Sequence, residues 1–169
     1  MENNKNHILI VDDDNKHPDR RSDFIRNFNG LCLDSPERSK TGGGVRLWTC
    51  DLTNKNQQWV YNLSSGMIQN MHGICIEAPN YNSIGAKLRM EQCNANALGQ
   101  RWSYDRDTYE FKIMNSAACL IWSSTGNAGK KVQTSSCGIP DNNHKWNYYP
   151  RQTHSYEIIM GNDGDVFGI

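Results

Sequence analysis

The chain has 169 residues, of which 37% are hydrophobic and 21% charged, and its 18 basic residues are balanced by 18 acidic ones. This length fits one domain with short extensions, and no apolar run approaches the length of a membrane span. Zero net charge with scattered basic residues differs from the basic patches of proteins that bind nucleic acids or acidic membranes.

Residues 1–22 form an N-terminal extension with one strand-like segment, 7–11, which is too short for the apolar core of a signal peptide. Three explanations stay open. A leader was removed and a starting methionine supplied, the protein is exported by another route, or it stays inside the cell. The acidic run 12–14 indicates a turn rather than a calcium site, because no twelve-residue loop with a distal glutamate accompanies it.

The central part, 23–149, repeats one pattern three times, over about 23–65, 66–108 and 109–149. In each copy a cysteine is followed after 18 residues by a second cysteine and after nine more by a tryptophan, and the copies start 43 and 44 residues apart. Such a period indicates one structural unit built three times, with each copy relying on its neighbours for a core. The triplets are Cys32, Cys50, Trp59; Cys75, Cys93, Trp102; and Cys119, Cys137, Trp146.

All six cysteines belong to this pattern, and their equal spacing favours one disulfide in each copy. Each bond would contribute roughly 3 kcal/mol in the chain-entropy model, and together they indicate an oxidising compartment, hence a secreted protein. Zinc would require close Cys-x-x-Cys pairs, which the sequence lacks. The alternative is a set of buried free thiols in a cytosolic protein.

Each copy contains four short strand-like segments separated by Gly, Asn, Ser or Pro turns, so the sequence predicts an all-β fold of about twelve strands with pseudo-threefold symmetry. In the segment before each second cysteine, alternate residues are mostly apolar and predict a core-facing side. These are Val45, Leu47, Leu88, Met90, Val132 and Thr134.

The opposite side of these segments is polar except at one position. Trp48 lies there, and an indole that faces solvent is informative because large aromatic residues are normally covered. Trp59, Trp102 and Trp146 instead occupy one equivalent place in all copies and are expected in the core, where replacement by alanine would remove several kcal/mol of stability.

The threefold Gln-x-Trp pattern, with a Cys-Leu-Asp strand opening and a second cysteine upstream, resembles the ricin B-type β-trefoil lectins over about three quarters of the chain. The resemblance implies a β-trefoil that binds carbohydrate of the galactose or N-acetylgalactosamine class. In the third copy His144 replaces the glutamine.

The family pattern of a sugar site is complete in the first copy, as Asp34, Trp48, Asn56 and Gln57. An aromatic ring stacks on the apolar face of a sugar, a carboxylate accepts hydroxyl protons, and amides both donate and accept. Arg46 lies on the same strand face as Trp48 and could reach a hydroxyl or an acidic sugar substituent. A structural role is equally well supported, because Arg89 occupies the same position in the second copy, which lacks the pattern of a sugar site.

The other two copies read as scaffold. The second has Glu77, Glu91, Gly99 and Gln100 at the matching places, and the third has Ile121, Ser135, Asn143 and His144. Glu91 would put a charge under the apolar face of a sugar, and Ile121 accepts no hydroxyl proton. Trp122 is expected to pack in the core or beside a subsite rather than to serve as a relocated platform.

The remaining motifs are weaker. The segment 62–64 matches the N-glycosylation pattern. The C-terminal extension 150–169 holds a strand-like segment, 156–160, an acidic run, 162–165, and an apolar end that hints at docking to a partner chain. The five histidines show no metal-binding spacing, and no catalytic motif is present.

The sequence thus predicts a secreted, non-enzymatic lectin without cofactor or metal and with one working site. The alternative is a receptor-binding or assembly subunit of a toxin-like complex, acting through contacts of its extensions or as a homo-oligomer. Non-lectin trefoils such as protease inhibitors and growth factors lack the repeated Gln-x-Trp.

Overall fold

The computed structural model describes residues 24–122 and 127–148. The predictions for both extensions fall outside these residues. The described part holds twelve strands and three short 3-10 helices, and none of its helices is long and apolar enough to cross a membrane. The elements are β1 (Ile25–Asn27), β2 (Leu31–Asp34), β3 (Arg46–Thr49), η2 (Lys55–Gln57), β4 (Trp59–Tyr61), β5 (Ile68–Asn70), β6 (Ile74–Glu77), β7 (Arg89–Gln92), η3 (Leu98–Gln100), β8 (Trp102–Asp105), β9 (Glu110–Ile113), β10 (Ala118–Ile121), β11 (Gln133–Ser136), η4 (Asn142–His144) and β12 (Trp146–Tyr148).

The strands form three antiparallel sheets that are offset by one strand from the sequence repeats. Their orders are β12-β1-β2-β3, β4-β5-β6-β7 and β11-β10-β9-β8. The last strand of each copy therefore pairs with the first strand of the next, as in the register Trp59↔Asn70 between β4 and β5. The chain closes on itself through Ile25↔Tyr148, between β1 and β12. No copy can complete a sheet alone.

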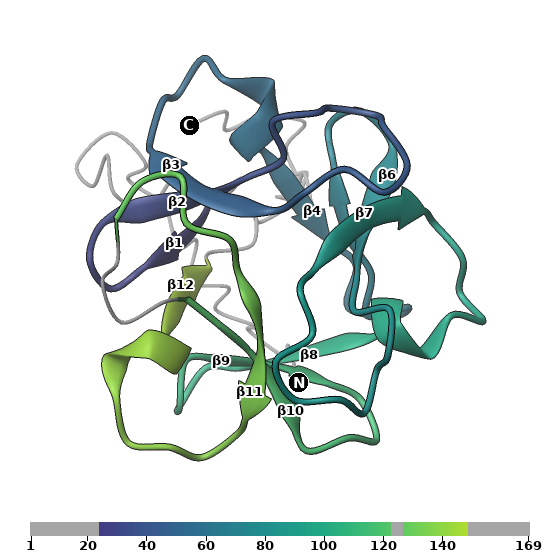
Figure 1. The fold of residues 1–169 in the computed structure, drawn as a ribbon, viewed down its shortest axis with the longest axis vertical. Coiled ribbons are helices and arrows are strands. Elements are labelled where there is room, and N and C mark those ends of the chain that lie inside the picture. Colours follow the sequence, from purple (N-terminus) through teal and green to yellow (C-terminus); the bar gives the residue numbers. More distant parts are fainter. Residues whose placement is uncertain (1–23, 123–126, 149–169) are drawn as a thin grey trace, which may run out of the picture.

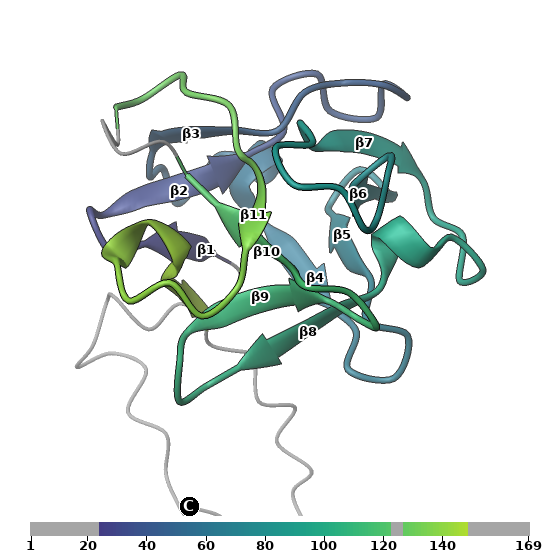
Figure 2. The ribbon, with the colours of Figure 1, turned by 60° about the horizontal axis from the view of Figure 1, so that its bottom comes forward.

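The three copies surround a pseudo-threefold axis, along which Figure 1 is viewed. The β3, β7 and β11 strands enclose its centre, and three isolated antiparallel bridges join the residues around it: Gly44↔Arg89, Lys87↔Gln133 and Arg46↔Lys131. Figure 2 shows these strands at one end of the molecule and the β8–β9 hairpin at the other. The arrangement is a β-trefoil, as the sequence predicts.

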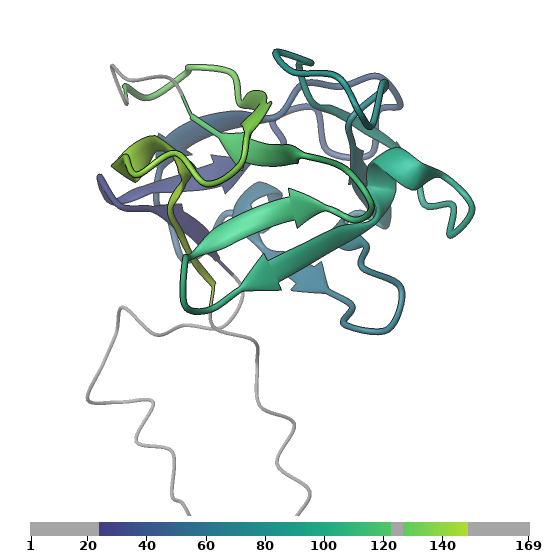
Figure 3. The same cartoon turned by 90° about the horizontal axis from the view of Figure 1, so that it is seen from below.

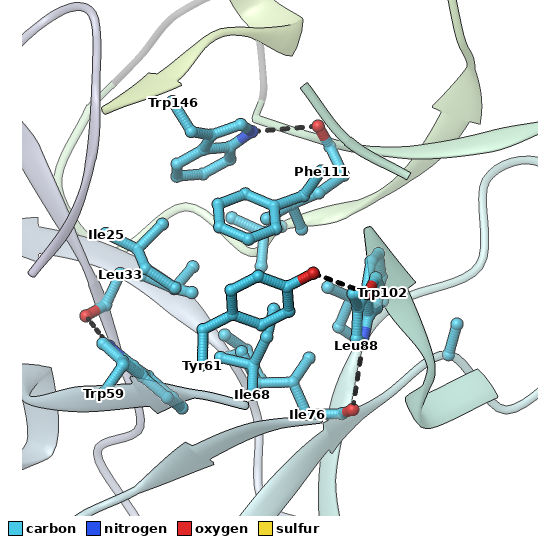
Figure 4. Packing of buried hydrophobic residues seen from close by; sticks show 14 of the residues in the cluster. Ile25, Leu33, Trp59, Tyr61, Ile68, Ile76, Leu88, Trp102, Phe111 and Trp146 are labelled. Atoms are coloured by element: carbon cyan, nitrogen blue, oxygen red, sulfur yellow. Dashed lines mark hydrogen bonds between the residues drawn. The ribbon is translucent and has the colours of Figure 1, made fainter. Parts of the chain in front are cut away.

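The core confirms the predicted alternation, since all six of the expected inward residues are at most 4% exposed. Trp59, Trp102 and Trp146 are at most 1% exposed, and each indole N–H donates to a main-chain carbonyl of its own copy. The acceptors are Leu33 at 3.0 Å, Ile76 at 3.3 Å and Leu120 at 3.0 Å (Figure 4). The tryptophans thus tie each fourth strand to the second strand of its repeat.

A second aromatic layer lies two residues beyond each tryptophan, where every copy has a tyrosine. The Tyr61 hydroxyl donates to the carbonyl of Trp102 at 2.9 Å, and the Tyr104 hydroxyl donates to that of Trp146 at 2.7 Å. The Tyr148 ring lies 5.8 Å from that of Tyr61 and 6.0 Å from that of Tyr104. Each of the first two copies is therefore hydrogen-bonded to the next at this level. The β8–β9 hairpin, which carries Tyr104, crosses the front of Figure 3.

The predicted disulfides are present: Cys32–Cys50, Cys75–Cys93 and Cys119–Cys137, with Cα–Cα distances of 5.1, 5.0 and 5.1 Å. Each links the second strand of a copy to the residue after its third strand. The glycosylation pattern 62–64 lies in an exposed turn, where the Asn62 side chain accepts from the amide of Ser64 at 2.9 Å.

Candidate functional site: a carboxylate, an indole and an amide in the first repeat

Asp34 ends β2 opposite Arg46 on β3, and this register brings the two side chains together. The Arg46 Nε donates to Oδ2 of Asp34 at 2.8 Å. Asp34 is 1% exposed, and its Oδ1 is buried without a hydrogen-bond partner. Burial raises the pKa of Asp34, and the bond from Arg46 only partly opposes this. A carboxylate with a spare acceptor oxygen favours a ligand that brings a donor.

Trp48 lies two residues farther along β3 and is 40% exposed, as the alternation along the strand predicts. The Arg46 guanidinium carbon lies 4.1 Å from the centroid of its ring, so one arginine contacts both Asp34 and the indole. The loop before β11 also approaches the ring, because a Cβ placed on Gly129 would lie 3.6 Å from its Cζ3. The indole is thus held by its surroundings while much of it faces solvent.

Asn56 lies on η2 at the rim of this site and is partly exposed. Asn54 caps the helix by accepting from the Asn56 amide at 3.0 Å, and the Asn56 carbonyl accepts from the Ser35 amide at 2.9 Å. The Asn56 side-chain oxygen lies 3.0 Å from Nε2 of His72, which belongs to the turn between β5 and β6. His72 was not predicted as part of the site, since it belongs to the second copy.

Gln57 was expected to contact a sugar hydroxyl, but its side chain is fully buried. Its oxygen accepts from the Asp51 amide at 2.9 Å, and its nitrogen donates to the Thr49 carbonyl at 2.9 Å. These bonds hold η2 against the end of β3. Gln57 therefore positions Asn56 and Trp48, and it carries no direct ligand contact in the proposal below.

The second repeat uses the same positions for a closed network. Glu77 accepts from Arg89 at 2.7 Å on one oxygen and from Gln100 at 2.8 Å on the other. Arg89 also lies 3.6 Å from Glu91, which replaces the platform. Glu77 thus has a partner on each oxygen, whereas Asp34 has one oxygen to spare. The shared Arg–carboxylate pair supports the structural role considered for Arg46.

Gly99 stands where the first repeat has Asn56, and its backbone lies against Ala78. A Cβ at Gly99 would overlap the Ala78 carbonyl oxygen, so no side chain fits without a backbone shift. The second copy therefore has no room for the rim amide.

We expect Gly99→Ala to lower the free energy of unfolding by roughly 1–3 kcal/mol, as overpacking does. Chemical denaturation measures the change. Gly73→Ala is the comparison, because Gly73 has a positive backbone φ angle and Gly99 does not. Unchanged stability would show that η3 shifts freely and that the second repeat has room for a side chain at this position.

The third repeat has no carboxylate at the matching position. Ile121 ends β10 there, Ser135 replaces the platform, and His144 is 3% exposed with its Nδ1 at 2.6 Å from Oδ1 of Asp141. This bond lowers the pKa of Asp141. Trp122 is 2% exposed and belongs to the core cluster, in agreement with the packing interpretation.

Among the described residues, no group of three His, Cys, Asp or Glu side chains could hold a metal ion. The first repeat offers a carboxylate, an amide and an exposed indole, which form hydrogen bonds and stack. Both are typical of carbohydrate recognition.

The family model of the ricin-type beta-trefoil lectin domain matches residues 64–166, which is more than half of the chain. The match begins at the end of the first repeat. No curated protein sequence matches the chain significantly. The chain belongs to the ricin-type β-trefoil lectin family.

Solved structures agree with this fold. The C-half of an earthworm R-type lectin in complex with GalNAc is 17% identical, with a TM-score of 0.62 over 73% of this chain and 94% of that one. The designed threefold-symmetric protein ThreeFoil is 20% identical, with a TM-score of 0.64 over 74% and 94%. A non-toxic homologue of type II RIPs from bitter gourd, in complex with α-methyl-D-galactoside, is 19% identical, with a TM-score of 0.63 over 75% and 46%.

Proposed function

We propose that this protein is a lectin for glycans of the galactose and N-acetylgalactosamine class, with one site in the first repeat. Support comes from the family and from the GalNAc and galactoside ligands of two similar structures. We take about 23–149 as the lectin domain. The three disulfides support function in an oxidising, extracellular setting, and we propose that the protein binds its glycan without transforming it.

The observation that carries the proposal is the spare buried oxygen of Asp34 beside the exposed ring of Trp48. In the bound state the sugar stacks on Trp48, a hydroxyl donates to Asp34, and Asn56 exchanges hydrogen bonds with a further hydroxyl. Asp34 is 1% exposed, so the sugar must first uncover it. Arg46 contacts both groups and its side chain is 31% exposed, so rotation of this arginine would expose them together.

A single shallow site of this kind binds weakly, at about millimolar, or roughly −4 kcal/mol. Useful avidity then requires several sites on one assembly or on neighbouring chains.

Loss of the platform tests the site directly. We expect Trp48→Ala to weaken binding by about tenfold, because ring stacking contributes about 0.5–1.5 kcal/mol beyond area burial. For a millimolar site this removes the signal from a glycan array and from titration calorimetry with methyl galactoside. Glu91→Ala, at the matching place of the second repeat, is the control and should bind as the wild type does. Normal binding by Trp48→Ala would refute the assignment.

The second candidate function is a binding or assembly subunit of a larger complex. The match covers only 46% of the bitter gourd chain, so the same fold also occurs as part of a longer protein. Removal of residues 1–20 or 150–169 separates the two ideas. Sugar binding should survive trimming if the trefoil is the functional unit, whereas a scaffold would lose its assembly with partner subunits.

A further inference from the structure

A cavity of about 460 Å³ is lined by residues at the start of β3 and β7 and by residues that lead into β11. These three strands surround the pseudo-threefold axis (Figure 1). The walls of the cavity come from all three repeats. Two sets of equivalent positions, of which all but Gln133 line the cavity, are the residues just before and just after the buried Val45, Leu88 and Val132. The first set is Gly44, Lys87 and Lys131, and the second is Arg46, Arg89 and Gln133.

Four of these six positions carry a cation, and all four line the cavity: Arg46, Lys87, Arg89 and Lys131. The cavity also has one acidic lining residue, Glu37, which is held by Lys40 and by the Gly44 amide at 3.1 Å. These contacts, and more weakly the charge of Lys131, lower the pKa of Glu37, so it stays ionised.

The two arginines form ion pairs with carboxylates, whereas the two lysines form none within the described part of the chain, and Lys131 acts on Glu37 only weakly and at longer range. Arg46 pairs with Asp34 and Arg89 with Glu77. Lys87 and Lys131 are exposed, and neither forms an ion pair with a carboxylate of the described residues. An anion that enters the cavity would therefore gain two ammonium partners without breaking an existing pair.

The cavity adjoins the candidate sugar site. Arg46 and Gly129 line it, and the same two residues contact or closely approach the ring of Trp48. A sugar hydroxyl that replaces Arg46 on Asp34 would free the guanidinium to face the cavity. One ligand can thus occupy both places.

We propose that the axial cavity binds an anionic substituent, a sulfate or a carboxylate, of the glycan whose neutral sugar stacks on Trp48. This inference rests on the proposed function and adds a preference for acidic glycans. The three isolated bridges, Gly44↔Arg89, Lys87↔Gln133 and Arg46↔Lys131, fix the spacing of the cations, so the preference is built into the trefoil axis.

The test compares neutral, sulfated and sialylated galactosides on the full chain by titration calorimetry. We expect at least one acidic galactoside to bind about tenfold more tightly than the neutral one at low salt, with the gain shrinking as salt is added. The double variant Lys87→Gln/Lys131→Gln should lose this gain and keep the neutral affinity. Lys112→Gln/Lys145→Gln removes the same charge elsewhere and should keep the gain. The sulfated and sialylated arms identify the substituent.

Equal affinity for neutral and acidic galactosides, or a gain that persists without Lys87 and Lys131, would overturn the inference and leave the proposed lectin function intact. Wild-type protein that binds no galactoside would instead overturn the proposed function. In that case inorganic sulfate alone tests the cavity. It should raise the melting temperature of the wild type but not that of the Lys87→Gln/Lys131→Gln variant. An equal shift in both proteins would overturn the cavity assignment as well.

Discussion

Replacement of Asp34 by asparagine is expected to abolish glycan binding without lowering the melting temperature. Asparagine keeps a neutral acceptor oxygen but loses the charge, and hydrogen bonds to a charged group contribute about 1.5–3 kcal/mol against about 0.5–1.5 kcal/mol for neutral ones. The difference weakens a millimolar site by about tenfold, which takes it below detection. The effect on stability has a different origin. Arg46 exchanges a charged partner for a neutral one, while its side chain is 31% exposed and keeps its contact with Trp48.

The sign of the stability change follows from the pKa of Asp34, which burial raises above its ordinary value. The folded protein takes up this proton at a higher pH than the unfolded chain does. Between the two pKa values the folded state binds more protons, so the free energy of unfolding falls as pH rises through that window. At neutral pH the ionised Asp34 therefore lowers stability, and asparagine removes this penalty. Sugar binding needs the ionised form and should decline as pH falls through the raised pKa.

Calorimetric titration with galactoside and thermal unfolding at neutral pH measure both effects on one sample. Glu77→Gln is the matched control in the second repeat, where both carboxylate oxygens have partners. It should lose roughly 1–3 kcal/mol of stability and keep its glycan affinity. A lower melting temperature together with intact binding in Asp34→Asn would mean that Asp34 is a structural residue.

Replacement of Trp102 by alanine is expected to give the largest loss of stability among the single changes considered, about 3–5 kcal/mol. Trp102 is fully buried, its indole donates to the Ile76 carbonyl at 3.3 Å, and its own carbonyl accepts from Tyr61. The change leaves a large cavity and deprives the buried Ile76 carbonyl of its indole donor, whereas the main-chain carbonyl that accepts from Tyr61 remains. For a domain of this size the melting temperature should fall by on the order of 10–20 °C.

Trp102 is preferable to Trp59 for this test because Trp59 donates to Leu33, which is next to Asp34, so its loss would disturb the site as well. Glycan binding by Trp102→Ala should persist at temperatures well below its transition. Trp102→Phe, which keeps an aromatic ring, should show a smaller loss. A change of only a few degrees in Trp102→Ala would show that the second repeat contributes little to cooperative stability.

The offset between sheets and repeats explains several features that the sequence did not predict. His72 reaches the first site from the second copy because β4 of one copy pairs with β5 of the next. The tyrosine layer also joins neighbouring copies, as in the bond from Tyr61 to Trp102. Its signal, a tyrosine two residues after each repeated tryptophan, was present in the sequence and could have been read.

Sequence alone determined the properties that depend on local spacing. The period predicted three units, the 18-residue interval predicted the disulfides, and the two-residue alternation placed Val45 in the core and Trp48 at the surface. Each of these follows from the pleat of a strand or from a fixed interval along the chain.

The tertiary structure decided which polar groups are already satisfied. Gln57 was predicted to contact the sugar, yet the fold buries its side chain. Glu77 has a partner on each oxygen, while Asp34 keeps an oxygen to spare. The fold also brought Lys87 and Lys131 together at the axis. Hydrogen-bond satisfaction and clustering of charge depend on contacts between distant segments, and these exist only once the three copies have closed around one axis.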